Sequence, residues 1–541
     1  MAARGGLPDT TSCMSLNPSP RDGWLRGLTF ALAILSFLVV LAAHHISDGD
    51  LWGKLAIGAH VWKFGDVPQH DMFAFTPVLP RYIEHEWGAG TIFFGVLKFF
   101  GSPGLMVLKI LLAFSAMAAA LATGRRLGAS WNALLLLAIP VAASLLPGYI
   151  PVIRSHAFTY CFFAITLFSL EELRNGKLWP AFILPPETLV WSNIHGGFVA
   201  GLGAMLVYTC FAFLPASRSQ NLGTDSSARR GPMRMLLVTI ICAATTLVNI
   251  YGLKFWAYLI PALLNKRPFI AEWQPLPLFA LDPFLGFRIL FVLVTGLLLA
   301  TWRRTVQKSW PGLIMLAVTA GLAWHSRRHA PFFAVTTLAF VGPFAQSALS
   351  SLRMLIKLRL QPKLVVLACY GAVAIYAATV ELPQASFDVL APIGHDPVRE
   401  VDILSRAKAT GNLATPFGWG CYCSWRLYPR IKISMDGRYE TTYPESTFEM
   451  NGDFYARHGT NWDRLIRNYT VDYVILEFTQ TRLRPRDLLD HGYDLIWETK
   501  GHSALMALQK HAATLRKVAA ALPPTTINPL DATITDKWWT H

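Results

Sequence analysis

Charged side chains are scarce in this chain of 541 residues, because Asp, Glu, Lys and Arg together make up only 15% of it. Hydrophobic residues make up 53%, and the mean hydropathy is +0.38. A soluble globule needs a polar surface, so this composition excludes that class. It indicates a polytopic membrane protein.

Cysteines are also few, with seven in the whole chain. Several of them lie inside apolar runs, where a thiol acts as a small hydrophobic side chain. Cys421 and Cys423 have neither the spacing of a zinc site nor an evident disulfide partner. The cysteines therefore give no redox or metal assignment.

About eleven apolar runs are candidate membrane spans, because a helix of about 20 apolar residues crosses a hydrocarbon core of about 30 Å. The first run has basic flanks but no convincing cleavage site, so we interpret it as an uncleaved anchor. The runs are 24–43, 103–123, 130–148, 155–171, 178–192, 196–215, 234–250, 284–301, 309–324, 329–349 and 363–381.

Lysine and arginine gather in alternate loops between these runs, and the positive-inside rule places those loops in the cytoplasm. The basic clusters lie at 21–26, 125–126, 174–177, 218–234, 303–308 and 353–363. The loop 44–90, the segment around His195, the segment 251–283 and everything after about residue 382 then face outward. The basic loops that stay in the cytoplasm account for the net charge of +15. No nucleic-acid partner is therefore expected.

We predict a mainly α fold, a transmembrane helical bundle of about eleven spans followed by a C-terminal extracytoplasmic α/β domain. The predicted parts are a disordered cytoplasmic N-terminus (1–23), a transmembrane domain (24–384) that includes the first outer loop (44–90), and a soluble domain (385–541). In the soluble domain, strand-like runs at 431–435, 471–478, 493–498 and 504–508 alternate with helical patterns around 396–409 and 460–469. The predicted location is the bacterial inner membrane.

The first outer loop carries the strongest chemical signal, since its residues 44–87 hold six acids and three bases in a chain that is basic overall. Asp48 and Asp50 lie two residues apart where the chain leaves the first span. A carboxylate beside a like charge has a raised proton affinity and can act as a general base toward a hydroxyl. The alternatives are two solvated loop acids, or a divalent metal site that includes His44 and His45.

Local patterns in this loop predict its backbone. Apolar residues at helical spacing from Leu51 to Trp62 predict an amphipathic helix lying in the membrane interface. Pro77 and Pro80 predict an extended segment that starts at Asp71.

Several cations break the charge rule, because they lie at the outer ends of spans. They are Arg154, Lys266, Arg267, Arg327 and Arg328. Such a side chain can snorkel to the lipid headgroups. Alternatively, Arg can bind the phosphate of a lipid-linked substrate through charged, bidentate hydrogen bonds.

Two catalytic motifs are incomplete. His85-Glu86 begins a zinc protease motif, but position 89 is Ala. His195-Gly196-Gly197 is similar to an oxyanion-hole segment of lipases, yet the chain has no GxSxG nucleophile. We expect the glycines to permit close helix packing and His195 to line the outward cavity. In the soluble domain, aromatic and polar residues at 419–425 and 435–439 suit either carbohydrate binding or a domain core.

The first outer loop resembles that of bacterial membrane glycosyltransferases of the GT-C class, related to protein O-mannosyltransferases and lipid A aminoarabinose transferases. The residues that carry the resemblance are Asp48-x-Asp50, Leu55, Gly58, Gly65, Pro68, Asp71-x-Phe73, Thr76 and His85-Glu86-Trp87. Segments 191–198, 249–252, 272–273 and 436–438 resemble a less characterised branch. The best-known branches often have His-Pro-Pro where this chain has Glu84-His85-Glu86, which leaves donor and acceptor open.

The resemblance implies a polyprenyl-phosphate sugar donor, an outward catalytic cavity and an acceptor that is a glycan, lipid or protein. Asp50, or Asp48, would deprotonate the acceptor hydroxyl, and His85 and Glu86 would orient the substrate. The predicted substrate-binding residues are Asp71, Arg154, His195, Glu272, Arg327 and Arg328. A divalent metal ion is a candidate cofactor. The alternatives are a transporter or flippase for lipid-linked glycans, although we find no inverted repeat, and a non-catalytic envelope scaffold.

Overall fold

The computed structural model describes residues 20–150, 152–214, 227–264, 270–356, 361–391, 395–523 and 528–529. Most of the predicted disordered N-terminus lies outside these residues, as do Lys266 and Arg267.

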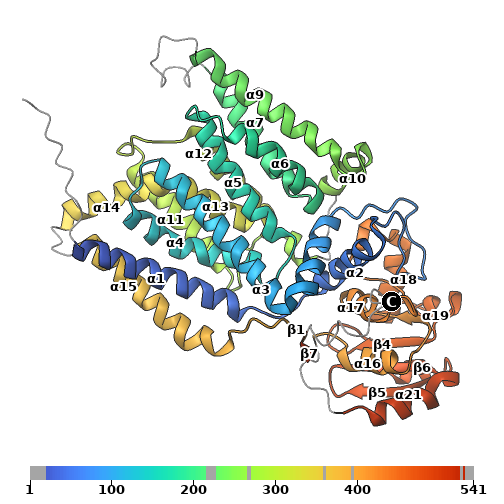
Figure 1. Cartoon of the computed structure of the whole chain (residues 1–541). Coiled ribbons are helices and arrows are strands. Elements are labelled where there is room, and N and C mark those ends of the chain that lie inside the picture. The colour runs from blue at the N-terminus through green and yellow to red at the C-terminus, as the bar shows by residue number, and fades with distance from the viewer. Residues whose placement is uncertain are drawn as a thin grey trace, which may run out of the picture.

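Helices occupy all the predicted spans and pack into one bundle (Figure 1). They are α1 (Pro20–Ala43), α3 (Trp87–Arg126), α4 (Trp131–Leu145), α5 (His156–Arg174), α6 (Pro180–Ile194), α7 (Phe198–Phe213), α9 (Ser227–Thr245), α11 (Leu285–Thr301), α12 (Trp310–His325), α13 (Ala330–Phe340) with α14 (Gly342–Ile356), and α15 (Pro362–Tyr376). Among the described residues, 5 helices are long and apolar enough to cross a membrane, or 6 if the bent pair α13 and α14 is one span. Outer positions of α11 such as Val292 (70% exposed) and Leu299 (80%) suit contact with lipid. The chain is a multi-pass membrane protein.

Ion pairs and hydrogen bonds join several helix ends on the predicted cytoplasmic side of the bundle. There Arg126 pairs with Glu172 at 3.1 Å, which joins the end of α3 to the end of α5. Glu171 accepts hydrogen bonds from Arg174 and from Ser309 at the start of α12. The first outer loop lies at the opposite end.

The first outer loop contains a helix, α2 (Gly49–Phe64), that packs against the outer arm of α3. The two helices meet at glycines, because a Cβ on Gly58 would lie 2.0 Å from the carbonyl oxygen of Gly90. The prediction that α2 lies in the membrane interface is wrong. Most of its residues from Leu51 to Ala59 are buried inside the protein, enclosed by the α3 arm and by a helix of the outer domain.

The arm of α3 exists because the helix is broken at Gly101. This residue has φ 66°, a left-handed value that glycine adopts without strain, and Pro103 follows it. The break separates the residues that reach the outer loop from those that span the bundle.

The outer domain is the predicted α/β domain, and all four predicted strands and both predicted helices are present. A five-stranded sheet has the order β3-β2-β4-β6-β5, in which β2 is parallel to β3 and β4 while β6 is antiparallel to β4 and β5. The strands are β2 (Gly411–Ala414), β3 (Ile431–Ile433), β4 (Tyr473–Glu477), β5 (Tyr493–Thr499) and β6 (Ser503–Leu508). The helices are α16 (Val398–Arg406), α17 (Gly420–Leu427), α18 (Glu445–Ala456), α19 (Arg464–Asn468), α20 (Arg486–Leu489) and α21 (Gln509–Ala521). A separate pair joins β1 (Leu390–Ala391) to β7 (Asn528–Pro529).

The first outer loop is joined to this domain by backbone hydrogen bonds. Ala74 forms a parallel bridge with Ile433 at the β3 edge of the sheet, and Ile46 forms another with Leu390. The segment from Asp71 is therefore extended, as predicted, because it runs along a sheet edge. Helix α17 of the outer domain also packs against α2. The domain and the loop therefore form one structure (Figure 1).

Candidate active site

A cavity of about 1470 Å³ opens between the transmembrane bundle and the outer domain. One side is apolar and is formed by α5, α7, α12 and α10 (Leu253–Leu264), a helix that the sequence patterns did not predict. The other sides are polar and come from α2, the loop 84–86, the 3-10 helices η3 (Ala271–Trp273) and η4 (Arg327–His329), and the outer domain. The cavity is therefore amphiphilic.

Most of the predicted site residues line this one cavity. They are Asp48, Asp50, His85, Glu86, Arg154, His195, Glu272 and Arg328. Two lie elsewhere. Arg327 lines a small neighbouring cavity of about 40 Å³, and Asp71 is buried in an ion pair with Arg438, its side chain 1% exposed.

Three carboxylates converge on the guanidinium of Arg154. Nε lies 2.5 Å from Asp48 and Nη2 lies 3.0 Å from Asp50, while Nη1 pairs with Glu272. Asp48 is also the N-cap of α2, since its Oδ1 accepts the backbone N–H of Leu51 at 3.1 Å. The cap fixes Asp48, whereas the Asp50 side chain is 50% exposed. Asp50 is therefore the more accessible of the two acids.

The pKa of Asp48 is raised to about 6, mainly by burial; Arg154 opposes this shift and Asp50 adds to it. We expect the ion pair between Asp48 and Arg154 to weaken as the pH drops through about 6, because the carboxyl of Asp48 then becomes neutral. Because the pKa of Asp48 is higher in the folded chain than in the unfolded chain, ionisation of this carboxyl lowers the free energy of unfolding. The loss is absent near pH 4 and complete above about pH 6. Asp48→Asn is therefore expected to unfold at a higher temperature than the native chain at pH 8, with the difference vanishing toward pH 4. Calorimetry across this range tests it, and a constant difference would contradict it.

A second charged cluster surrounds Lys54, which lies one turn after Asp50 on α2. Its Nζ lies 3.0 Å from Glu84 and 2.8 Å from Glu86. Burial opposes all three charges, but their mutual attraction outweighs it, so the pKa of both carboxyls lies below the usual range and that of Lys54 above it. Glu86 is thus a fixed anion that orients its neighbours, and it is a poor proton acceptor.

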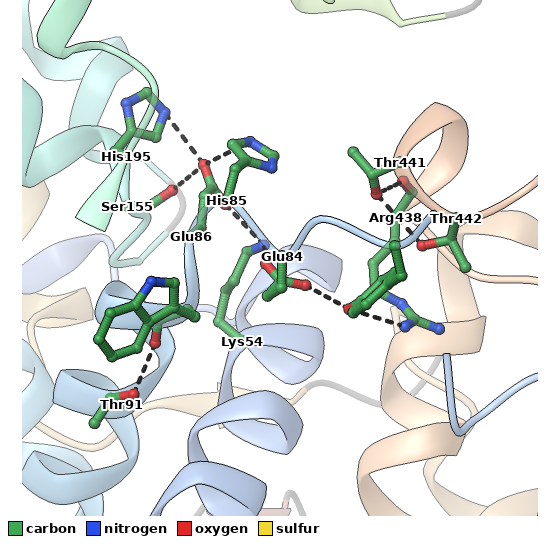
Figure 2. Close-up of polar contacts among 12 residues, drawn as sticks. Lys54, Glu84, His85, Glu86, Thr91, Ser155, His195, Arg438, Thr441 and Thr442 are labelled. Carbon is green, nitrogen blue, oxygen red and sulfur yellow. Dashed lines mark hydrogen bonds and ion pairs between the residues drawn. The ribbon is translucent and has the colours of Figure 1, made fainter. Parts of the chain in front are cut away.

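Glu86 also anchors two groups on the bundle side of the cavity (Figure 2). It accepts from the hydroxyl of Ser155 at 2.9 Å and lies 3.2 Å from Nε2 of His195. Nδ1 of His195 accepts the N–H of Gly197 at 2.8 Å, so the ring proton belongs on Nε2. Burial lowers the pKa of His195 to about 3, which keeps the ring neutral. His195 is therefore a hydrogen-bond donor with one tautomer.

Arg328 enters the cavity from η4, where two groups orient it. Its Nη2 lies 2.7 Å from Nε2 of His156, and its guanidinium lies over the ring of Trp273 at 4.3 Å. An arginine restrained in this way presents charge at the border between the apolar and polar parts of the cavity.

Comparison with solved structures identifies the architecture. The archaeal oligosaccharyltransferase AglB from Archaeoglobus fulgidus, in complex with an inhibitory peptide and a dolichol-phosphate, aligns with a TM-score of 0.56 and 12% identity over 85% of this chain and 70% of AglB. The arabinofuranosyltransferase AftD from Mycobacteria aligns with a TM-score of 0.55 and 12% identity over 90% of this chain and 40% of AftD. The chain has the GT-C fold. No family model and no curated protein sequence matches it.

In this GT-C chain the carboxylates do not gather as a metal site. Within the described ranges, no group of three or more His, Cys, Asp or Glu side chains could hold a metal ion. Arg154 occupies the centre between Asp48, Asp50 and Glu272. The alternative metal site that would include His44 and the two aspartates is not formed, because Nδ1 of His44 forms a hydrogen bond with the carbonyl of Val40 at 2.8 Å.

The polar cluster continues into the outer domain through Tyr82. The hydroxyl of Tyr82 donates to Glu84 at 2.7 Å and lies 3.4 Å from Nη1 of Arg438. Arg438 in turn pairs with Asp71 at 2.5 Å and with Asp436 at 2.8 Å. Figure 2 shows Glu84 and Arg438, with dashed lines for the contacts that connect them. Asp71 therefore positions the outer domain against the loop.

Three important residues of this GT-C site received no role from the sequence. They are Lys54, His156 and Arg438. A signal existed for Lys54, because a base one turn from Asp50 in an acidic loop is a natural partner for other acids. His156 and Arg438 owe their roles to contacts between segments far apart in the chain, which spacing along the sequence does not reveal.

Proposed function

We propose that this protein is a glycosyltransferase of the bacterial inner membrane that moves a sugar from a polyprenyl-phosphate donor to an acceptor hydroxyl on the outer face. The observation that carries the proposal is the amphiphilic cavity. Its apolar side offers a site for an isoprenoid tail, and carboxylates and arginines lie at its polar end. The GT-C fold and the dolichol-phosphate bound to AglB support the same donor class.

In this proposal two charged residues assist the reaction, Asp50 at the acceptor and Arg328 at the leaving phosphate. The acceptor oxygen attacks the anomeric carbon, its proton passes to Asp50, and the bond from that carbon to the phosphate oxygen breaks. The polyprenyl phosphate leaves with the electron pair, and Arg328 stabilises its charge, which is often the larger contribution in such sites. Arg154 holds Asp50 in place at 3.0 Å, and the neutral His195 donates a hydrogen bond to Glu86 or to the bound sugar.

The direct test is a transfer assay. Purified protein is incubated with radiolabelled polyprenyl-phosphate sugars and a cell-envelope extract, and we expect label to move from the lipid to a new product. Movement of intact lipid-linked sugar across vesicles, without cleavage of its phosphate bond, would instead favour a flippase.

Arg328→Met is expected to raise the KM for the lipid-linked donor about 10- to 100-fold, because a hydrogen bond to a charged group contributes about 1.5–3 kcal/mol. The kcat should fall as well, because Arg328 is proposed to stabilise the charge that develops on the leaving phosphate. Steady-state kinetics over a range of donor concentrations measure both. Arg303→Met, just beyond the far end of α11, is the matched control. An unchanged donor KM in Arg328→Met would contradict this role.

A further inference from the structure

One wall of the cavity takes no part in the roles proposed above. It belongs to the outer domain and presents rings, hydroxyls, an amide and an acid. Its main residues are Phe417, Tyr439, Thr441, Glu477, Thr479 and Gln480.

The rings form a small aromatic platform. Phe417 and Tyr439 are half-buried with centroids 6.1 Å apart, and Phe448 packs against Tyr439 at 4.8 Å. Tyr439 has φ 37°, a left-handed conformation that bulky residues rarely adopt. Such strain persists where surrounding contacts impose it, and it is most frequent at functional sites.

Polar groups beside the platform can exchange several hydrogen bonds with a ligand. Thr479 and Gln480 are exposed in the cavity, and the hydroxyl of Thr479 donates to Glu477 at 2.9 Å. Glu477 is itself buried, so this bond orients the threonine. Hydroxyl and amide groups can both donate and accept, which suits ligands rich in hydroxyls.

The charge of this wall disfavours anions. Among the described residues that line it, the arginine present is Arg438, which is already paired with Asp71 and Asp436. His395 lies at the edge, where its hydrogen bond to Asp396 raises its pKa against the opposing effect of burial, and the carboxylate of Asp396 at 3.5 Å balances the charge of the protonated ring. A phosphorylated or acidic ligand would meet Glu477 without a spare arginine or lysine.

The platform also lies beside the proposed base. A Cβ built on Gly437 would lie 3.6 Å from Oδ1 of Asp50, and Gly437 is only two residues from Tyr439. Oδ2 of Asp50 faces Arg154, so the other oxygen faces the outer domain. A hydroxyl of a ligand on the platform would therefore lie next to Asp50.

We propose that this wall binds an uncharged saccharide, so that the acceptor of the transfer is a neutral glycan chain. This inference rests on the proposed function only where it makes the bound saccharide the acceptor of the transfer. The binding site itself can be tested without turnover.

The test is saturation-transfer NMR on the full chain in nanodiscs. The probes are neutral trisaccharides of mannose, glucose and arabinose, the mannose trisaccharide with a terminal phosphate, and a neutral hexapeptide. We expect at least one neutral trisaccharide to bind, and its phosphorylated form to bind at least tenfold more weakly. Binding of the peptide in place of the saccharides, equal binding of the phosphorylated form, or no saccharide binding at all would overturn the proposal.

Variants locate the binding on this wall. The double variant Thr479→Ala/Gln480→Ala should weaken saccharide binding at least tenfold, whereas Thr460→Ala/Gln509→Ala, a matched pair of exposed residues outside the cavity, should not. Tyr439→Gly removes the ring and adopts the positive φ without strain, so it is expected to fold and to lose binding. Saccharide binding that survives both changes would place the site elsewhere.

The two proposals can fail separately. If Asp50→Asn abolishes transfer while the wall variants leave the KM for the acceptor unchanged, the enzyme assignment stands and the saccharide site fails. If the saccharide binds at the wall while the native chain moves no label from the lipid donor, the saccharide site stands and the enzyme assignment fails.

Discussion

Replacing Asp50 by Asn is expected to lower the rate of sugar transfer about 10²- to 10⁴-fold, the usual contribution of a positioned general base. Asn keeps the size of the side chain and can still accept a hydrogen bond from Arg154, which lies 3.0 Å from Asp50. It cannot take a proton from the acceptor hydroxyl. The loss should therefore appear in kcat, with the KM for the donor little changed.

The measurement is a steady-state transfer assay with the purified native chain and both variants. Asp66→Asn is the matched control, because Asp66 is an exposed acid of the same loop that pairs with His60 at 3.1 Å, outside the cavity. It should transfer at the native rate. Native transfer by Asp50→Asn would contradict the role of Asp50 as the general base.

Replacing Lys54 by Met is expected to lower the free energy of unfolding by about 3–5 kcal/mol, because it leaves two buried carboxylates without their cation. Glu84 is 4% exposed and Glu86 is 8% exposed. Both carboxylates are therefore largely shielded from water. Thermal unfolding in detergent measures the change, and a midpoint within error of the native value would contradict it.

A compensating variant separates charge from packing. Lys54→Met/Glu84→Gln/Glu86→Gln removes the charges of all three residues while keeping their approximate volumes. Its stability should recover most of the loss, since the cost in Lys54→Met comes from unpaired charge. A triple variant as unstable as the single one would show that the packing of the lysine stem matters more than its charge.

The helices and the outer sheet follow from local sequence patterns. Apolar runs predicted a helix at every proposed span, and alternating hydrophobic runs predicted β3, β4, β5 and β6. Strand β2 and helices α17, α18 and α21 were missed, because each is short or has no strong periodicity.

The candidate site was predictable only in part. The excess of acids in the first outer loop pointed to Asp48, Asp50 and Glu86. The positive-inside rule pointed to the arginines that break it, because charged residues next to apolar runs can be recognised in the sequence. The loop helix was misplaced because its apolar residues were interpreted as facing lipid, while in the structure they face the α3 arm and the outer domain. Which surface covers an apolar face is a property of the tertiary fold, and the sequence pattern is the same in both cases.

The hydrogen bonds between the first loop and the outer domain have a consequence for biogenesis. Ser47 donates to Asp396, a partner 349 residues later in the chain, and Ala74 forms its bridge with Ile433. The loop is therefore synthesised long before its partners exist, and these contacts form only after the last part of the chain has been made. A ribosome stalled before that point would leave an inserted protein whose cavity lacks the wall that the outer domain provides.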